Sequence, residues 1–167
     1  RFSNDQFELI PIGSESPNSI RAILNIEDTS LFCATRNGLY QFNGQTFSIY
    51  ENEKLTGLNM SDIALRDNEI FISTYYAGLI ALNLSSSEIR TIVTPINRIR
   101  NIHVTKDAIL CATKNGATEI SGNSVFHYNL QNGLIFENIR SVFIDREQNI
   151  WLGTDGKGLL KLTGKSI

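Results

Sequence analysis

Short apolar runs separated by polar turns recur along the chain, and the pattern repeats about every forty residues. The turns are rich in Asn, Asp, Ser and Gly, which is typical of β-strands joined by tight turns. No segment sustains the apolar period of a helix, so the sequence predicts an all-β fold. Each period holds up to four predicted strands: strand a at 20–26, 60–65, 99–104 and 139–144; strand b at 31–35, 70–74, 109–113 and 150–154; strand c at 39–42, 79–82, 117–120 and 159–162; and strand d at 46–50, 89–93 and 125–128.

A Thr followed after a short loop by a Gly marks the same place in every period. The threonines are 39, 39 and 41 residues apart, and the pairs are Thr35 with Gly38, Thr74 with Gly78, Thr113 with Gly116 and Thr154 with Gly158. A fixed period near forty residues filled by short strands is typical of a β-propeller, in which each period forms one four-stranded blade. We expect the Gly to supply a positive φ or a close approach where strand b turns into strand c.

The periods divide residues 1–167, a single propeller segment, into four predicted blades. These are 19–58, 59–97, 98–137 and 138–167, and the last stops as its strand d begins. Residues 7–12 look like a strand d with no strands a to c before it, so 1–18 are predicted to provide strand d of a preceding blade or to close the fourth blade. Four repeats could close on themselves, but we favour a segment of a larger, seven-bladed ring. In isolation its two end blades would expose apolar faces or pair with another copy.

One slot in strand b carries a bulky residue in every period, with a small residue two positions later. The bulky residues are Phe32, Phe71, Leu110 and Trp151. Residues two apart share one face of a strand, so this slot is expected to pack between blades. We therefore interpret Trp151 as packing rather than as a ligand platform. Cys33 and Cys111 occupy equivalent positions two blades apart, too far for a disulfide, and are expected to act as small hydrophobic residues.

Composition narrows the function classes. The net charge is −2, and no run of like charges occurs, so neither nucleic acid nor an anionic membrane surface is indicated as a partner. No apolar stretch approaches the ~20 residues that span a bilayer, so no membrane contact is expected of this segment itself. The chain begins with Arg rather than Met and carries no signal peptide, so we expect a piece of a longer protein.

The fourth period closely resembles the two-component regulator propeller repeat. The resemblance rests on Asn138-Ile139-Arg140-Ser141-Val142, on Asn149-Ile150-Trp151-Leu152-Gly153-Thr154 and on Gly158-Leu159. The opening recurs at 18–23 and 98–102, and the Gly-Leu pair that often precedes a repeat occurs at 57–58 and 133–134. The second and third periods lack the Trp, and the third has Ala117 instead of Leu after the Gly.

The resemblance implies a specific setting. Such repeats usually build the periplasmic sensor region of membrane-bound hybrid histidine kinases in Bacteroidetes, as two seven-bladed propellers followed by a β-sandwich and one transmembrane helix. Many of these regions sense oligosaccharides. By this resemblance the chain is expected to be part of a periplasmic sensor, with an oligosaccharide as ligand and a homodimer formed through the parent ectodomain. A protein–protein or dimerisation scaffold without a small ligand is the alternative.

Little in the sequence indicates catalysis. The two histidines, His103 and His127, lie in predicted strands, and no Cys/His cluster has metal-ligand spacing. No glycine-rich phosphate loop and no nucleophile elbow is present. We therefore predict no enzymatic activity, no metal and no cofactor. A propeller lyase or hydrolase would require a metal or a catalytic triad around one of the histidines.

An Arg occupies the same place in strand a of three periods: Arg21, Arg100 and Arg140, with Ser61 in the remaining one. One interpretation is a ring of guanidinium groups near a channel mouth that binds sugar hydroxyls or carboxylates. The other is that each Arg bonds loop carbonyls of a neighbouring blade. We favour the second, because a residue shared by the repeats is expected to be architectural.

Ligand specificity is expected where the repeats differ, in the b–c loops on one face. The candidates there are Arg36, Asn37, Tyr75, Tyr76, Lys114, Asn115, Asp155 and Lys157. The pair Tyr75-Tyr76 is notable, because aromatic rings stack on sugars and their hydroxyls form hydrogen bonds. A Tyr that covers the neighbouring blade explains the pair equally well. The d–a loops at 51–59 and 131–138 are long enough to line a site or an interface.

Overall fold

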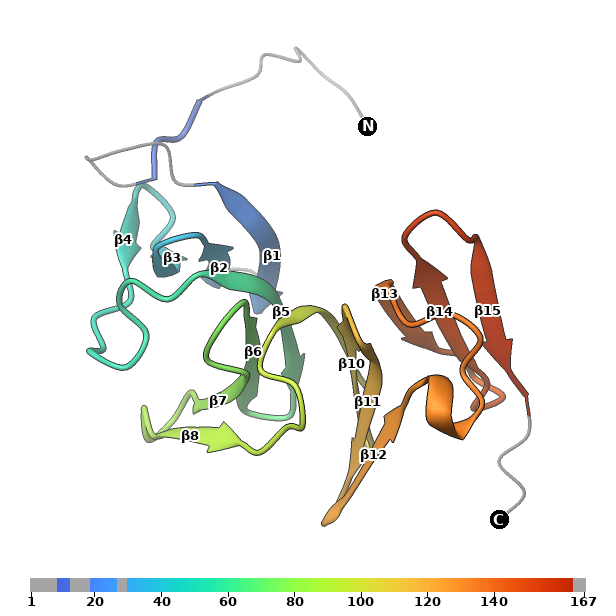
Figure 1. Ribbon diagram of the computed structural model, residues 1–167. Coiled ribbons are helices and arrows are strands. Elements are labelled where there is room, and N and C mark those ends of the chain that lie inside the picture. The colour runs from blue at the N-terminus through green and yellow to red at the C-terminus, as the bar shows by residue number, and fades with distance from the viewer. Residues whose placement is uncertain (1–8, 13–18, 27–29, 164–167) are drawn as a thin grey trace.

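A computed structural model describes residues 9–12, 19–26 and 30–163 and shows four antiparallel sheets in chain order (Figure 1). In the first three sheets the strand order equals the sequence order, and the fourth has three strands. The sheets are β1 (Ile20–Ile26), β2 (Ser30–Thr35), β3 (Gly38–Phe42) and β4 (Phe47–Ile49); β5 (Met60–Arg66), β6 (Glu69–Thr74), β7 (Leu79–Asn83) and β8 (Ile89–Ile92); β9 (Ile99–Val104), β10 (Ile109–Thr113), β11 (Gly116–Ser121) and β12 (Ser124–Tyr128); and β13 (Ile139–Ile144), β14 (Ile150–Thr154) and β15 (Leu159–Leu162).

These sheets are the predicted propeller blades, called blades 1 to 4 below, and the all-β fold is confirmed. The first strands of consecutive blades lie side by side, since β1 contacts β5, β5 contacts β9 and β9 contacts β13 (Figure 1). The described residues contain one helical turn, the 3-10 helix η1 (Leu130–Asn132), within the long d–a loop after β12. Asn129 caps this turn by accepting the backbone N–H groups of Gln131 and Asn132.

The N-terminal segment lies elsewhere than predicted, as far as it is described. Ile12 forms a parallel bridge with Phe47 of β4, so residues 9–12 lie beside the outer strand of blade 1 and not beside blade 4. The outer strand of a blade has a free edge, and the chain that leads into blade 1 is tethered close to it. The remaining residues of the predicted strand, 7 and 8, are outside the described residues, as is the end of the chain after 163.

Three apolar clusters form the core, and each lies between two consecutive blades. Phe32 of blade 1 packs with Ile63 of blade 2, Phe71 of blade 2 packs with Ile102 of blade 3, and Leu110 of blade 3 packs with Val142 of blade 4. The bulky slot in strand b therefore faces the following blade, as predicted. Its partner is a recurrent apolar slot in strand a of that following blade.

In the first and last blades the residues at these interface positions are not covered by another described blade. Ile63, Ile102 and Val142 are at most 7% exposed, but their counterpart in blade 1, Ile23, is 61% exposed. At the other end Trp151 is only partly buried, and Leu159 is 62% exposed. No blade follows β15 among the described residues, so the Trp151 slot has no blade to pack against. Both end faces thus have the composition of an interface between blades.

Trp151 is held within its own blade instead. Its indole Nε1 donates to Asp145 Oδ2 (2.8 Å), and Lys161 Nζ lies 4.7 Å from the centre of the ring. Asp145 also accepts the backbone N–H groups of Glu147 and Asn149. The hydrogen bond from Trp151, followed by that from Asn149, lowers the pKa of Asp145 to about 2. The motif that spans these residues is therefore a braced hairpin.

A line of polar side chains joins blades 2, 3 and 4 along their inner strands, which are the first strands of each blade: β5, β9 and β13. Asp62 accepts the side-chain N–H of Asn101 and the backbone N–H of Ile102. Asn101 in turn accepts the backbone N–H of Val142 through Oδ1 (2.9 Å). Burial raises the pKa of Asp62 and outweighs the lowering by these hydrogen bonds. Hydrogen bonds are directional, so these fix the position of each blade relative to the next more closely than apolar contacts do by themselves.

The repeated motif of a Thr followed by a Gly, called the Thr–Gly motif below, forms the same local structure in all four blades. Each Thr hydroxyl donates to the carbonyl of its Gly and accepts a backbone N–H from the loop between them. All four glycines have φ between +76° and +123°, so the predicted positive φ is confirmed. The Thr side chain adds hydrogen bonds to the backbone pairing of Thr and Gly at the point where the strand turns back, and the Gly adopts the positive φ that the turn requires.

Gly116 is the position where this turn is most constrained. A Cβ at Gly116 would overlap the carbonyl oxygen of Tyr128, whereas a Cβ at Gly122 would meet no atom within 4 Å. Both residues have positive φ. We expect Gly116→Ala to lower the free energy of unfolding by about 3 kcal/mol or more and Gly122→Ala by about 1 kcal/mol. Equilibrium urea unfolding followed by Trp151 fluorescence measures both, and equal losses would contradict the clash.

Ile63 and Ile23 occupy the same slot with and without a neighbouring blade. Ile63→Ala is expected to lower the free energy of unfolding by about 3 kcal/mol, because it leaves a cavity between two blades. Ile23→Ala should cost less than about 1 kcal/mol, because the side chain is mostly exposed. The same urea titration compares the two variants at low protein concentration. Comparable losses would mean that another surface covers Ile23 in solution.

Candidate ligand site

A polar pocket of about 450 Å³ lies where the inner strands begin and the b–c loops end. It is lined by residues from all four blades: Arg21 and Arg36 from blade 1, Asn59, Tyr75 and Tyr76 from blade 2, Arg98 and Arg100 at the start of blade 3, and Arg140 from blade 4. We call it the arginine pocket. It brings together six of the eleven residues that the sequence nominated as ligand-binding candidates.

Tyr75 occupies the middle of this pocket and contacts two neighbouring blades. The guanidinium carbon of Arg21 lies 5.6 Å from the centre of the Tyr75 ring, and that of Arg98 lies 5.7 Å from it. Such distances are typical of cation–π contacts. The contacts support the interpretation that this Tyr covers adjoining blades. Tyr76 differs, since it is 74% exposed and presents its ring to solvent at the pocket rim.

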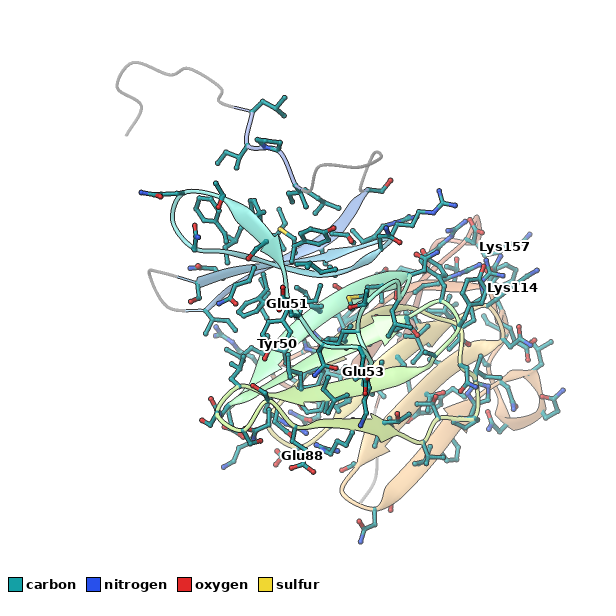
Figure 2. The ribbon with its side chains drawn as sticks, turned by 90° about the vertical axis from the view of Figure 1, so that its left-hand side faces the viewer. Tyr50, Glu51, Glu53, Glu88, Lys114 and Lys157 are labelled. Atoms are coloured by element: carbon teal, nitrogen blue, oxygen red, sulfur yellow. The ribbon has the colours of Figure 1, made fainter. Side chains whose placement is uncertain are left out.

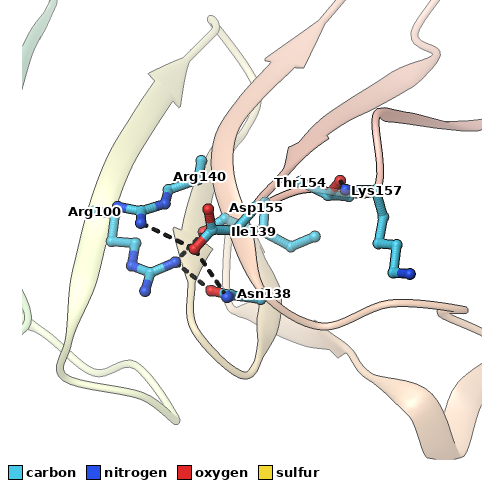
Figure 3. Close-up of polar contacts among 7 residues, drawn as sticks. All are labelled: Arg100, Asn138, Ile139, Arg140, Thr154, Asp155 and Lys157. Atoms are coloured by element: carbon cyan, nitrogen blue, oxygen red, sulfur yellow. Dashed lines mark hydrogen bonds and ion pairs between the residues drawn. The ribbon is translucent and has the colours of Figure 1, made fainter.

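Arg100 and Arg140 belong to one hydrogen-bonded group at the border of blades 3 and 4 (Figure 3). Arg100 Nη1 donates to Asn138 Oδ1 (2.6 Å) and to the backbone carbonyl of Ile139 (3.1 Å). Arg140 Nη2 donates to Asp155 Oδ2 (2.9 Å), which also accepts Asn138 Nδ2 (3.0 Å). Arg100 therefore bonds a backbone carbonyl of the following blade, which is the architectural role that the repeat position suggested.

Blade 2 reaches the equivalent carbonyl with a shorter side chain. Ser61, the residue that stands in the Arg position there, donates to the carbonyl of Ile99 (2.7 Å). Ile99 is the counterpart of Ile139 in the next blade. Ser61 thus preserves the contact between blades that Arg makes elsewhere, but it brings no positive charge to the pocket.

Electrostatic effects follow from this crowding of guanidinium groups. Burial lowers the pKa of Arg100, and the charges of Arg140 and Arg98 lower it further, against the opposing effect of Asp155. The hydrogen bond from Arg140 lowers the pKa of Asp155. Asp155 is therefore ionised at neutral pH, and it compensates part of the positive charge of Arg140 and Arg100.

The remaining candidates lie on the same end of the molecule without lining the pocket. These are Asn37, Lys114, Asn115, Asp155 and Lys157. Figure 2 shows Lys114 and Lys157 at this end, whereas Glu88, in the turn between β7 and β8, lies at the opposite end. In Figure 3 the Lys157 side chain points away from the group around Asp155. The b–c loops thus add two lysines to the end of the molecule that holds the arginine pocket.

Two pocket residues, Asn59 and Arg98, are not among the individual candidates that the sequence nominated. Each directly precedes the first strand of a blade, at the end of a d–a loop. Asn59 ends the 51–59 loop that the sequence predicted could line a site, whereas Arg98 ends a shorter loop that was not predicted. The available signal for Arg98 was topological, since d–a and b–c loops emerge on the same face of a propeller.

The two histidines lie apart in different strands. His103 packs against Phe143, with 4.7 Å between ring centres, and burial lowers its pKa. His127 pairs with Thr118 through Nδ1 and with the carbonyl of Asn115 through Nε2. Within the part of the chain that the structure describes, no group of three or more His, Cys, Asp or Glu side chains is placed to hold a metal ion.

Comparison with known proteins identifies the repeat. Residues 133–156, which include the braced hairpin of Trp151, match the family model of the two component regulator propeller. This segment is therefore similar to a two component regulator propeller repeat. The match lies in the period where the sequence resemblance is strongest. No curated protein matches the chain.

Solved structures show the same fold. Two extracellular domains of hybrid two component systems from B. thetaiotaomicron superpose with TM-scores of 0.77 and 0.66, at 20% and 23% identity, over 89% and 86% of this chain. The chain spans 24% and 21% of their lengths, so it corresponds to about a quarter of such a domain. A computationally designed protein, 7% identical, superposes over 95% of this chain and 98% of its own with a TM-score of 0.71. Among the described residues no helix is long and apolar enough to cross a membrane.

The arginines can be separated experimentally by their contacts. Arg100→Gln removes two hydrogen bonds to blade 4, so we expect it to lower the free energy of unfolding by about 1–2 kcal/mol. Arg36 is exposed and its side chain has no hydrogen bond to any described residue, so Arg36→Gln should change the free energy by less than about 0.5 kcal/mol. Urea unfolding compares them. A similar loss in both would show that Arg100 does not tie blades 3 and 4 together.

Proposed function

We propose that this chain is part of the ligand-sensing propeller region of a hybrid two-component sensor histidine kinase, and that it acts in the periplasm. The proposed ligand is a soluble oligosaccharide. We assign no catalytic activity to the chain. The four blades form part of a larger ring in this proposal, because the interface slots at both ends, around Ile23 and Leu159, are open.

The observation that carries the proposal is that one pocket draws residues from all four blades. A ligand bound there contacts every blade at once, so its binding depends on how the blades are placed relative to one another. Tyr76 offers an exposed ring for stacking on a sugar, and the surrounding side chains offer hydrogen-bond donors. This is the composition of a site for a polar, hydroxylated molecule.

Signalling would follow from a difference in affinity. A ligand shifts an equilibrium between two arrangements of a protein only if it binds one of them more tightly. In the proposed mechanism the oligosaccharide favours one geometry of the parent homodimer, and the kinase reads that geometry. The contacts across blades 1 to 4 make the pocket sensitive to such rearrangement.

A second candidate function is a protein–protein scaffold, and one feature favours it. An apolar groove of about 510 Å³ lies between β12, η1 and blade 4, and its lining includes Phe126, Leu134, Ile135 and Leu159. Several of these side chains are exposed. Large exposed apolar surfaces of this kind mark interfaces. The groove adjoins the open end face, so neighbouring blades would cover part of it.

The test is calorimetric titration of an oligosaccharide panel into this chain and, in parallel, into a longer ectodomain that contains it. We expect binding to both, weakened about tenfold by Tyr76→Ala, because the variant removes the exposed stacking ring. Tyr75→Ala should also weaken binding, with some loss of stability since its ring contacts Arg21 and Arg98. Phe126→Ala, an exposed aromatic residue outside the pocket, is the matched control and should bind normally.

The comparison of this chain with the longer ectodomain separates the candidate functions. Binding to the longer ectodomain alone would place the site outside these blades and make this segment a scaffold. Binding to neither would reject oligosaccharide sensing. Loss of binding in Phe126→Ala, with Tyr76→Ala unaffected, would move the site to the apolar groove.

A further inference from the structure

The arginine pocket has an excess of positive charge that the contacts among the described residues do not explain. Five of its eight lining residues are arginines, and none of its described lining residues is acidic. The whole chain carries a formal net charge of −2, so this concentration is local. Like charges gathered in one pocket repel one another: burial lowers the pKa of Arg100 most, and the charges of Arg140 and Arg98 lower it further.

Only two of the five arginines have hydrogen-bond acceptors among the described residues. Arg100 and Arg140 are engaged by Asn138, Ile139 and Asp155. The guanidinium groups of Arg21 and Arg98 contact the Tyr75 ring, and that of Arg36 has no described partner. Neither contact supplies a carbonyl or carboxylate oxygen. The guanidinium groups of Arg21, Arg36 and Arg98 therefore line the pocket without a hydrogen-bond acceptor among the described residues.

Planar guanidinium donors match the oxygen pairs of carboxylate and sulfate groups. The contacts of Arg21 and Arg98 with the Tyr75 ring restrict these side chains before any ligand binds, which lowers the entropy cost of binding. Lys114 and Lys157 lie at the same end of the molecule and add to the attraction of an anion at a distance. The pocket is therefore suited to an anion.

One pocket residue requires a donor rather than an acceptor. Asn59 lines the pocket, and its Oδ1 is buried with no hydrogen-bond donor in the described structure. Such an atom loses its water without replacement, which is unfavourable. Rotation of the amide toward the pocket would let Oδ1 accept a hydroxyl. Inorganic sulfate has no hydroxyl at neutral pH, whereas a sugar has several.

We infer that the arginine pocket binds a saccharide that carries carboxylate or sulfate groups. The acidic group lies among Arg21, Arg36 and Arg98, a sugar hydroxyl reaches Asn59, and the exposed ring of Tyr76 stacks on the sugar. The inference rests on the proposed function and specifies its ligand as an acidic sugar rather than a neutral one. The pocket volume of about 450 Å³ is in the range of small-molecule sites.

The experiment compares sugars that differ only in the acidic group. The probes are digalacturonate beside α-1,4-galactobiose, 6-sulfated N-acetyllactosamine beside N-acetyllactosamine, and sodium sulfate alone. Each is titrated calorimetrically into the whole chain at low and high NaCl. We expect at least one acidic sugar to bind about tenfold or more tightly than its neutral counterpart, with a smaller advantage at high salt. Sodium sulfate should bind more weakly than either acidic sugar that binds.

The variants place that advantage in the pocket. Arg98→Gln and Arg21→Gln should each remove most of the preference for the acidic sugar, so that the ratio of its affinity to that of its neutral counterpart falls toward one. Arg146→Gln is the matched control, because it removes one positive charge from an exposed turn outside the pocket. Its preference should equal that of the wild type. Thermal unfolding of each variant confirms that it is folded.

Four results would overturn the inference: equal affinity within both pairs, no binding of either acidic sugar, sodium sulfate binding as tightly as the sulfated sugar, or a preference that persists in both Arg variants. Equal affinity within a pair would leave the proposed oligosaccharide function intact, because a neutral sugar would still bind. The proposed function itself fails only if the longer ectodomain also binds no oligosaccharide.

Discussion

Apolar contact between consecutive blades is the interaction on which the rest of this structure depends. A single four-stranded sheet with two apolar faces has no interior of its own, so each blade buries its faces against the next. The slot pairs Phe32 with Ile63, Phe71 with Ile102 and Leu110 with Val142 repeat this contact. Because the contact is the same each time, successive blades turn by a similar step, and their inner strands come together.

The placement of the candidate site follows from that convergence. Inner strands that lie side by side bring their first residues to one end, and the Thr–Gly turns hold the b–c loops over the same end. Polar contacts then set the exact relation of neighbouring blades, through the line from Asp62 to Asn101 and through Arg100 at the carbonyl of Ile139. The arginine pocket is thus a product of blade stacking and not of any single loop.

The arginines of the repeat divide into two groups by their contacts. Arg100 ties blade 3 to blade 4, while Arg21 contacts the Tyr75 ring and has no hydrogen-bond acceptor among the described residues. Ser61 shows that the architectural contact does not require a charge. At this position of the repeat a Ser can reach the same carbonyl as an Arg. In the blades that have an Arg there, its charge is therefore available for another role, and these charges lie together in the arginine pocket.

Much of the fold could be predicted because its causes are local. Neighbours within one hairpin determine the alternation of apolar residues, the Thr–Gly motif and the bulky position in strand b. The sequence alone therefore predicted the all-β blades, the positive φ of the glycines and the packing of the bulky position between blades. It also nominated Arg21, Tyr75 and Arg140, since they recur or differ at fixed places in the repeat. Tertiary structure decided what depends on neighbours far along the chain. Ile23 and Ile63 share one slot and one residue type, yet only the presence of an adjoining blade buries the second. Likewise Asn59 and Arg98 line the same pocket because stacked blades bring the ends of different d–a loops together. The sequence pattern of a single repeat does not determine how successive blades are arranged.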